Sequence, residues 1–257
     1  MKKSVLIRIA LAGLVLTGAI GFHSCDPSTL DKTLTALNTI NDILNSDAVQ
    51  ELYGWNQSDE NLAEVESDIS FGTAAGTGNL PSSVDISSDF PPIGHQGAYG
   101  TCVAWAVGYN LRSYMHSYYA GGNPGSASGQ FSPKDLFWSI DNDAKGDDCG
   151  GTYFEVAFDV LVNRGVATLE TVPYEELGDC SNSPESSWTS AASNYKIANY
   201  RKIGTDGDID VDVIKDYLAN KRPVVIGAKL GDNFMDWSSS NAGEVLSSET
   251  YGYSGQH

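Results

Sequence analysis

Hydrophobic positions divide the chain into an apolar N-terminal stretch, a polar lead-in and a longer body. Residues 9–22 carry no charge and follow a positively charged start that includes Lys2 and Lys3. This apolar stretch is too short to cross a hydrocarbon core of about 30 Å and has the layout of a secretory signal, which we place at residues 1–24. In the lead-in, apolar residues at helical spacing predict one amphipathic helix: Leu30, Leu34, Leu37, Ile40 and Leu44.

The body, residues 80–257, shows helical patterns first and a strand pattern late. Apolar spacing and capping residues predict four helices: 102–119 closed by Gly121-Gly122, one starting at Ser132-Pro133, 152–164 stopped by Gly165, and 210–221. The segment from Pro223 to Leu230, apolar except for Lys229, predicts a buried strand. This order indicates an α+β fold with a helical N-terminal half and a β-rich C-terminal half.

Acidic residues dominate the charge, with 33 Asp and Glu against 15 Lys and Arg and a net charge of −18. This balance argues against a nucleic-acid partner, which requires clustered basic residues. Half of the net charge lies in the lead-in, where residues 26–79 hold ten acids and one base. We interpret residues 25–79 as a solvated linker; a pro-segment that covers a groove until it is removed is the alternative.

The four cysteines are too few for a disulfide scaffold and lack the spacing of a metal site, so no cofactor is implied. Cys25 follows the apolar stretch and the small residue Ser24, which resembles the lipidation site of bacterial lipoproteins. We therefore expect an exported lipoprotein of the cell envelope or surface; a secreted protein that loses Cys25 with its signal is the alternative. Outside the cytosol, a pair of cysteines persists as a disulfide.

Cys102 stands where a glycine-containing loop, residues 96–101, meets the first residue of a predicted helix. The positive end of a helix and its unpaired N–H groups favour a thiolate over a thiol. A thiolate is a strong nucleophile, which makes Cys102 a candidate for covalent catalysis. The alternative is a buried structural cysteine, which behaves as a small hydrophobic residue.

Further segments are similar, in the same order, to landmarks of the papain-like cysteine peptidases. They span the body: Leu80–Asp85, Phe90–Gly97, the helix after Cys102, Phe131–Leu136, Asp148–Gly151, Gly165–Tyr174, Pro223–Val225 and Gly255–His257. The resemblance implies a papain-like α+β fold and a peptidase that cleaves polypeptides. It implies Cys102 as the nucleophile, Gln96 as an oxyanion-hole donor, and Gly150 and Gly151 as substrate-binding glycines. The alternative for the two glycines, which the sequence alone favours, is a tight turn after a cysteine.

Histidines other than His23 in the signal are candidates for the general base. His116 follows Cys102 by 14 residues on one helix, about 21 Å along its axis, and cannot reach the thiol. His95, beside Gln96, is sterically possible. His257 follows Cys102 by 155 residues, close to the papain-type separation of about 130–150. We expect His257 to form an ion pair with Cys102 and to protonate the leaving amine, although a terminal or tag-derived histidine is an alternative.

Two departures from the resemblance modify these expectations. Tyr99 stands where the family has a cysteine that forms a disulfide with the cysteine of the "C-x-G-G" turn, here Cys149. Cys180 stands where the family has another disulfide cysteine, so the resemblance implies that Cys149 pairs with Cys180 instead; two reduced, buried cysteines are the alternative. The family also has an asparagine in an "N-S-W-G" segment after the histidine, whereas this sequence stops at His257. We therefore expect a domain that lacks its C-terminal end and has an exposed sheet edge.

The leading hypothesis is a cysteine peptidase that hydrolyses peptide bonds through a thioester at Cys102, with His257 as base and acid. We expect a monomer that meets the membrane only through its lipid anchor. A non-catalytic surface lipoprotein that binds peptides is a second hypothesis, because the asparagine and the last strands are missing. A thiol acyltransferase that uses the same acyl chemistry is a third.

Overall fold

The computed structural model describes residues 54, 56, 65, 80–203, 211–231 and 253–257. The expected signal, the lipidation site at Cys25 and the amphipathic helix of the lead-in lie outside these residues. The chain divides into two units, Met1–Gln50 and Glu51–His257, and the described residues all belong to the second. Within this described part, the helices are too short or too polar to cross a membrane.

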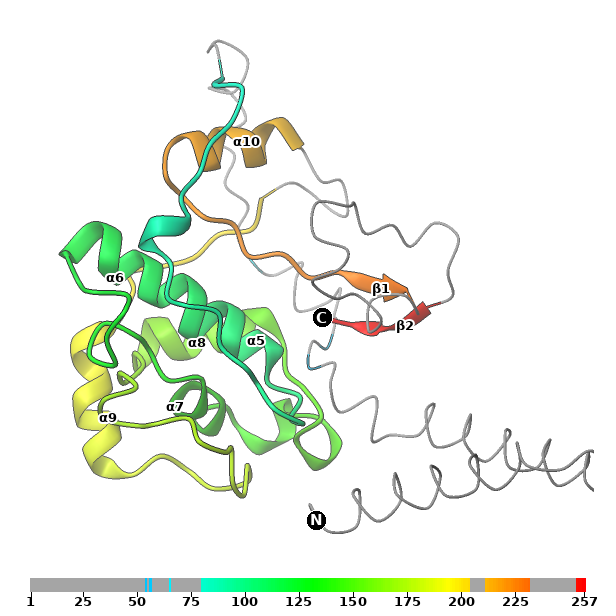
Figure 1. Ribbon diagram of the computed structural model, residues 1–257. Helices are drawn as coiled ribbons and strands as arrows, with labels where there is room; N and C mark the ends of the chain where they lie inside the picture. Colours follow the sequence, from blue (N-terminus) through cyan, green and yellow to red (C-terminus); the bar gives the residue numbers. More distant parts are fainter. Residues whose placement is uncertain (1–53, 55, 57–64, 66–79, 204–210, 232–252) are drawn as a thin grey trace, which may run out of the picture. The chain divides into compact units, whose positions relative to one another are not determined.

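A continuous helical rod carries Cys102 at its first position. It consists of α5 (Cys102–Ala104), a π-helical segment (Trp105–Arg112) and α6 (Ser113–Ala120), which run end to end in Figure 1. Gly121 follows with a φ of 70°, and its N–H donates to the carbonyl of Ser117. The glycine therefore ends the rod as the sequence predicts. The π-helical part is a feature that apolar spacing did not predict.

The remaining helices are α7 (Pro133–Trp138), α8 (Phe154–Asn163), α9 (Ser186–Ala192) and α10 (Val211–Ala219). Ser132 caps α7 as predicted, since its side chain accepts a hydrogen bond from the N–H of Asp135. Gly165, with a φ of 86°, follows the end of α8, again as predicted. Helix α9 was not predicted, because its sequence of small and polar residues has little apolar periodicity. Short 3₁₀ turns occupy Ser87–Asp89, Asn142–Ala144, Asp147–Cys149 and Ser193–Tyr195.

The apolar core joins the rod to α7 and α8, which pack against it. Its fully or almost fully buried side chains include Val103 and Val107 from the rod, Leu136 and Phe137 from α7, and Leu161 from α8. This packing fixes the direction of the rod and therefore the place of its first residue, Cys102.

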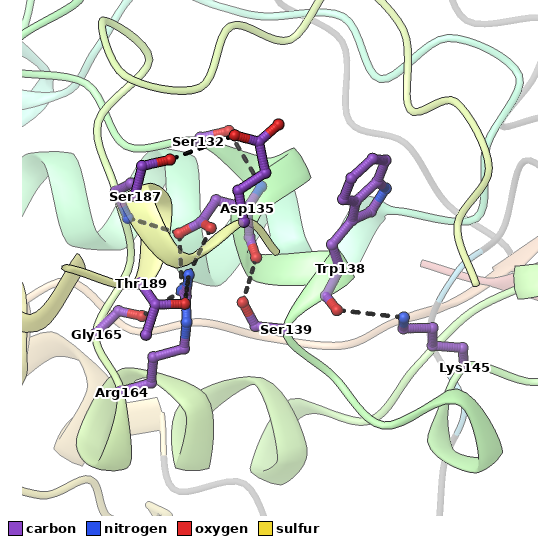
Figure 2. Close-up of polar contacts among 11 residues, drawn as sticks. Ser132, Asp135, Trp138, Ser139, Lys145, Arg164, Gly165, Ser187 and Thr189 are labelled. Carbon is purple, nitrogen blue, oxygen red and sulfur yellow. Dashed lines mark hydrogen bonds and ion pairs between the residues drawn. The ribbon is translucent and has the colours of Figure 1, made fainter. Parts of the chain in front are cut away.

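A buried ion pair ties α7 to the end of α8. Both guanidinium NH groups of Arg164 donate to the carboxylate of Asp135, at 2.8 and 2.9 Å, as Figure 2 shows. The same carboxylate accepts the N–H of Ala167 at 2.7 Å. The Asp135 side chain is fully buried, so these donors replace the water that its charge would otherwise require.

The described strands form one antiparallel pair, β1 (Lys229–Gly231) with β2 (Tyr253–Gln256) (Figure 1). In its register Leu230 lies opposite Gly255, and a bulge follows Leu230. The prediction of a buried strand over 223–230 was wrong for most of its length. Residues 223–228 are half-buried or exposed, and Ile226 is 68% exposed. Among the described strands, β1 pairs with β2 on one side alone. The apolar residues before β1 are therefore less buried than they would be inside a larger sheet.

Candidate active site

Cys102 is the first residue of α5, at the N-terminus of the rod, as the sequence predicts. It is 6% exposed and is a free thiol. The preceding residue, Thr101, is fully buried, and its carbonyl accepts the N–H of Trp105 at 3.0 Å. The loop and the helix are therefore joined by a regular first turn that places the sulfur at the positive end of the rod.

The loop 96–101 forms the first wall of the site. The side-chain amide of Gln96 donates to the carbonyl of Tyr99 at 2.9 Å, inside the loop. The hydroxyl of Tyr174 donates to the main-chain carbonyl of Gln96 at 2.8 Å. It also lies 3.1 Å from the hydroxyl oxygen of Thr101. Gln96 and Thr101, the residue before Cys102, therefore belong to one hydrogen-bonded loop, and Tyr174 contacts both of its ends.

The turn around Cys149 forms the second wall. Cys149 and Cys180 form a disulfide, which is the pairing implied by the sequence. The ammonium group of the buried Lys145 donates to the carbonyl of Cys180 at 2.8 Å and to Oδ1 of Asn142 at 3.0 Å. The carbonyl of Lys145 in turn accepts the N–H of Gly151 at 3.0 Å. A covalent bond and a buried cation thus hold the glycine turn in place.

A short piece of the lead-in lies between these two walls. The N–H of Gly54 donates to Sγ of Cys102 at 3.2 Å. The N–H of Thr152 donates to the carbonyl of Gly54 at 2.7 Å, and the N–H of Asn56 donates to the carbonyl of Thr152 at 2.8 Å. Thr152 therefore bonds through its N–H to Gly54 and through its carbonyl to Asn56, as a residue does in a strand that pairs with its neighbour, and the thiol lies beside Gly54.

Glycines make this close approach of three backbones possible. A Cβ on Gly54 would overlap the carbonyl oxygen of Gly100, and a Cβ on Gly151 would lie 2.7 Å from the carbonyl oxygen of Gly54. A Cβ on Gly100 would lie 2.5 Å from the carbonyl carbon of Gly150. The space between the two walls therefore admits a backbone and leaves no room for side chains at these positions.

The residue that pairs with the extended segment is Thr152, which sequence reasoning missed. Gly150 and Gly151, the predicted substrate-binding glycines, lie in the same turn, but the N–H of Gly151 is bonded to Lys145. Thr152 is fully buried, and its hydroxyl donates to the carbonyl of Ala144 at 2.8 Å. The sequence predicts that this helix begins at residue 152, but α8 begins at Phe154. The backbone pairing of Thr152 explains the later start.

The electrostatics of the thiol differ from the expectation. Burial raises the pKa of Cys102 to about 11, although the N–H groups of Gly54, Val103 and Cys102 itself act in the opposite direction. With the lead-in segment in place, the helix terminus is outweighed by the loss of water around the sulfur. The site therefore holds a protonated thiol at neutral pH and not the expected thiolate.

The described histidines occupy three different environments. His257 continues the β1–β2 pairing, since its N–H and carbonyl exchange hydrogen bonds with Ala228 at 3.0 and 2.9 Å. Burial lowers the pKa of His257, which favours a neutral imidazole over the expected imidazolium. A catalytic pairing of His257 with Cys102 stays a prediction.

His116 packs edge-on against Phe131 and Tyr195 in the helical half, which agrees with its exclusion as the base. His95 lies exposed immediately before the first wall, and its Nδ1 accepts the N–H of Gly97 at 2.9 Å. Among the residues that the structure describes, no cluster of three or more His, Cys, Asp or Glu side chains is arranged to hold a metal ion.

Comparison with known proteins places this arrangement in a structural class. The structure is similar to xylellain, a cysteine protease from Xylella fastidiosa, with a TM-score of 0.60 and 20% sequence identity over 81% of this chain and 78% of xylellain. A structure of the mite allergens Blo t 1 and Der p 1 matches with a TM-score of 0.45 and 19% identity over 65% of this chain and 51% of that one. Procathepsin B from Trypanosoma congolense matches with a TM-score of 0.40 and 20% identity over 51% and 43% of the two chains. No protein-family model and no curated protein matches the sequence.

The chain therefore has the α+β fold of the papain-like cysteine proteases, as the sequence predicts. At 20% identity the similarity establishes the fold alone, because one fold can carry different activities.

Proposed function

We propose that this protein is a cysteine peptidase that acts on polypeptides, with Cys102 as its nucleophile. One observation carries the proposal: the backbones of Gly54 and Asn56 both bond to that of Thr152, while the Gly54 N–H contacts the sulfur of Cys102. A site that accepts a peptide backbone by strand pairing beside a thiol has the arrangement needed for attack on a peptide bond.

The proposed reaction proceeds in two steps. In the first step, His257 takes the proton of the Cys102 thiol, Sγ attacks the carbonyl carbon of the scissile bond, and His257 passes that proton to the departing amine as the C–N bond breaks. In the second step, His257 deprotonates a water that attacks the thioester; the C–S bond breaks, the acid product leaves, and the proton returns to the Cys102 sulfur. The Gln96 amide and the Cys102 N–H stabilise the negative oxygen that develops in each step. Gly150, Gly151 and Thr152 receive the substrate backbone, and no cofactor takes part.

We also propose that residues 25–79 act as a pro-segment, which is the alternative to the linker interpretation. The contacts of Gly54 and Asn56 support this assignment, because they occupy the space between the two walls. Residues 1–24 would act as the export signal and Cys25 as the lipid attachment site of a monomeric envelope protein. The Cys149–Cys180 disulfide is consistent with an extracellular location.

The test uses the full-length chain and its Gly54→Ala variant, in which the added Cβ would disfavour the bound segment. A peptidyl vinyl sulfone is compared with iodoacetamide, which lacks the peptide part. We expect the peptidyl reagent to modify Cys102 at least 100-fold faster per mole than iodoacetamide in the variant, and a fluorogenic peptide to be hydrolysed. Cys102→Ala and His257→Ala chains serve as controls and should abolish turnover.

The alternatives give different outcomes in the same experiment. A non-catalytic peptide-binding protein would bind the peptide without turnover, and an acyltransferase would transfer the acyl group to an added amine in preference to water. If both reagents modify Cys102 at equal rates and no peptide is cleaved, the peptidase proposal is wrong.

A further inference from the structure

The hydroxyl group of Tyr174 contacts both ends of the loop that carries the proposed catalytic groups. It donates to the main-chain carbonyl of Gln96 at 2.8 Å and lies 3.1 Å from the hydroxyl oxygen of Thr101, the residue before Cys102. A single oxygen atom therefore connects the first and last residues of the loop 96–101.

The Tyr174 ring is itself held firmly. Its edge packs on Trp105, in the first turns of the rod, with ring centroids 5.0 Å apart. Trp105 also packs on Tyr109 at 4.8 Å. Burial raises the pKa of Tyr174, so its hydroxyl stays protonated and can donate throughout the neutral range.

The loop needs such a contact because it has no covalent attachment to the second wall. Tyr99 stands where the resemblance to the papain-like peptidases places a cysteine, and Cys149 is bonded to Cys180 instead. Cys180 follows Tyr174 by only six residues. The segment 174–180 therefore attaches to the first wall through a phenol and to the second wall through a disulfide.

We propose that Tyr174 is a positioning residue that sets the loop 96–101 in the geometry needed to stabilise the oxyanion. This inference rests on the proposed peptidase function. Fixing the Gln96 carbonyl fixes the backbone from which the Gln96 amide extends, and fixing Thr101 fixes the approach to the Cys102 N–H. Removal of the hydroxyl shifts these donors without removing them. The loss is therefore smaller than the roughly 10²–10³-fold fall in kcat seen when an oxyanion donor is deleted.

The test compares Tyr174→Phe with Tyr200→Phe, both in the full-length Gly54→Ala chain. Tyr200 is a matched control because its hydroxyl donates to Asp159 at 2.9 Å on the outside of α8. The probes are a peptide aldehyde, which forms a tetrahedral thiohemiacetal with Cys102, and the corresponding peptide alcohol, which binds without a bond. In forming the adduct, Sγ bonds to the aldehyde carbon and the thiol proton passes to the former carbonyl oxygen.

For Tyr174→Phe we expect about tenfold weaker inhibition by the aldehyde and about tenfold lower kcat, with KM and alcohol binding within about twofold of the parent. Tyr200→Phe should leave all four quantities unchanged. Thr101→Val, which keeps the Gln96 contact, is a second variant and should give a partial loss of the same kind.

Parent-like aldehyde inhibition and kcat in folded Tyr174→Phe would overturn the positioning role while leaving the peptidase proposal intact. Equal weakening of aldehyde and alcohol would also overturn it, because that result indicates a general loss of the binding site. A parent chain that forms no aldehyde adduct and cleaves no peptide would overturn the proposed function, and this inference with it.

Discussion

The backbone N–H of Gly54 donates a hydrogen bond to Sγ of Cys102 at 3.2 Å, across 48 residues of sequence. This contact places a piece of the acidic lead-in directly against the proposed nucleophile. Burial raises the pKa of the thiol, whereas the hydrogen bond from Gly54 acts in the opposite direction. Because Gly54 contacts the sulfur, the reactivity of Cys102 should depend on whether Gly54 and Asn56 are in place.

Replacing Gly54 with alanine should expose the thiol. The new Cβ would overlap the carbonyl oxygen of Gly100, so the segment cannot keep its present position. We expect the rate of Cys102 alkylation by iodoacetamide at pH 8 to rise at least tenfold, measured by mass spectrometry of the intact chain. Gly125→Ala is the matched control, since Gly125 is exposed and lies away from Cys102. Equal alkylation rates in the two variants would show that Gly54 does not protect the sulfur.

The pH dependence of the same reaction should report the burial of Cys102. Because burial raises the pKa of the thiol to about 11, only about one sulfur in 1,000 is a thiolate at pH 8. The alkylation rate of the full-length chain should therefore rise through pH 9 and 10, and the midpoint should fall in Gly54→Ala. The unfolded thiol, with a pKa near 9, loses its proton first, so folding stability should decrease as pH rises from about 9 to 11. An alkylation midpoint near 8.5 in the full-length chain would contradict this account.

Local signals in the sequence predicted the helical half well. Gly121 and Gly165 end helices because their left-handed φ values are accessible to glycine, and Ser132 caps α7 because its hydroxyl accepts a backbone N–H. Such signals act within a few residues and need no knowledge of the rest of the chain. The position of Cys102 at the start of a helix followed from the same kind of evidence.

Features that depend on distant contacts were missed or wrong. The raised pKa of Cys102 results from its burial in the folded chain, whereas the local sequence indicated the opposite shift. The role of Thr152 arises from its pairing with Gly54 and Asn56, which no periodicity encodes. A lone Gly-Trp-Asn sequence within the acidic lead-in was the one available signal for that contact. The prediction of a buried strand over residues 223–228 was wrong for a related reason, because burial depends on which segments pack against a strand.

The disulfide should contribute substantially to the stability of the second wall. Cys149 and Cys180 are 31 residues apart, and closing a loop of this length stabilises a fold by about 3–4 kcal/mol in chain-entropy models. We expect the Cys149→Ser/Cys180→Ser chain to lose a free energy of unfolding of this size in urea denaturation. The wild-type chain measured under reducing conditions is the control and should lose a similar amount, whereas an unchanged midpoint in both would contradict the prediction.

Asp135→Asn should destabilise the helical half far more than the loss of an exposed ion pair. The Asp135 carboxylate is fully buried and accepts two hydrogen bonds from Arg164 (Figure 2). It also accepts one from the N–H of Ala167. Asparagine leaves the guanidinium without its counter-charge, which costs about 3–5 kcal/mol for a buried pair.

Asp212→Asn provides the matched comparison for that substitution. Asp212 pairs with Lys215 at 2.9 Å on α10, where the two side chains are 72% and 58% exposed. Water already screens this pair, so its loss should change the free energy of unfolding by less than about 1 kcal/mol. Both variants are measured by urea denaturation at pH 7, with far-ultraviolet circular dichroism as the signal. Similar losses in the two variants would show that burial of Asp135 does not strengthen its pairing with Arg164, and that the connection between α7 and α8 depends on apolar packing alone.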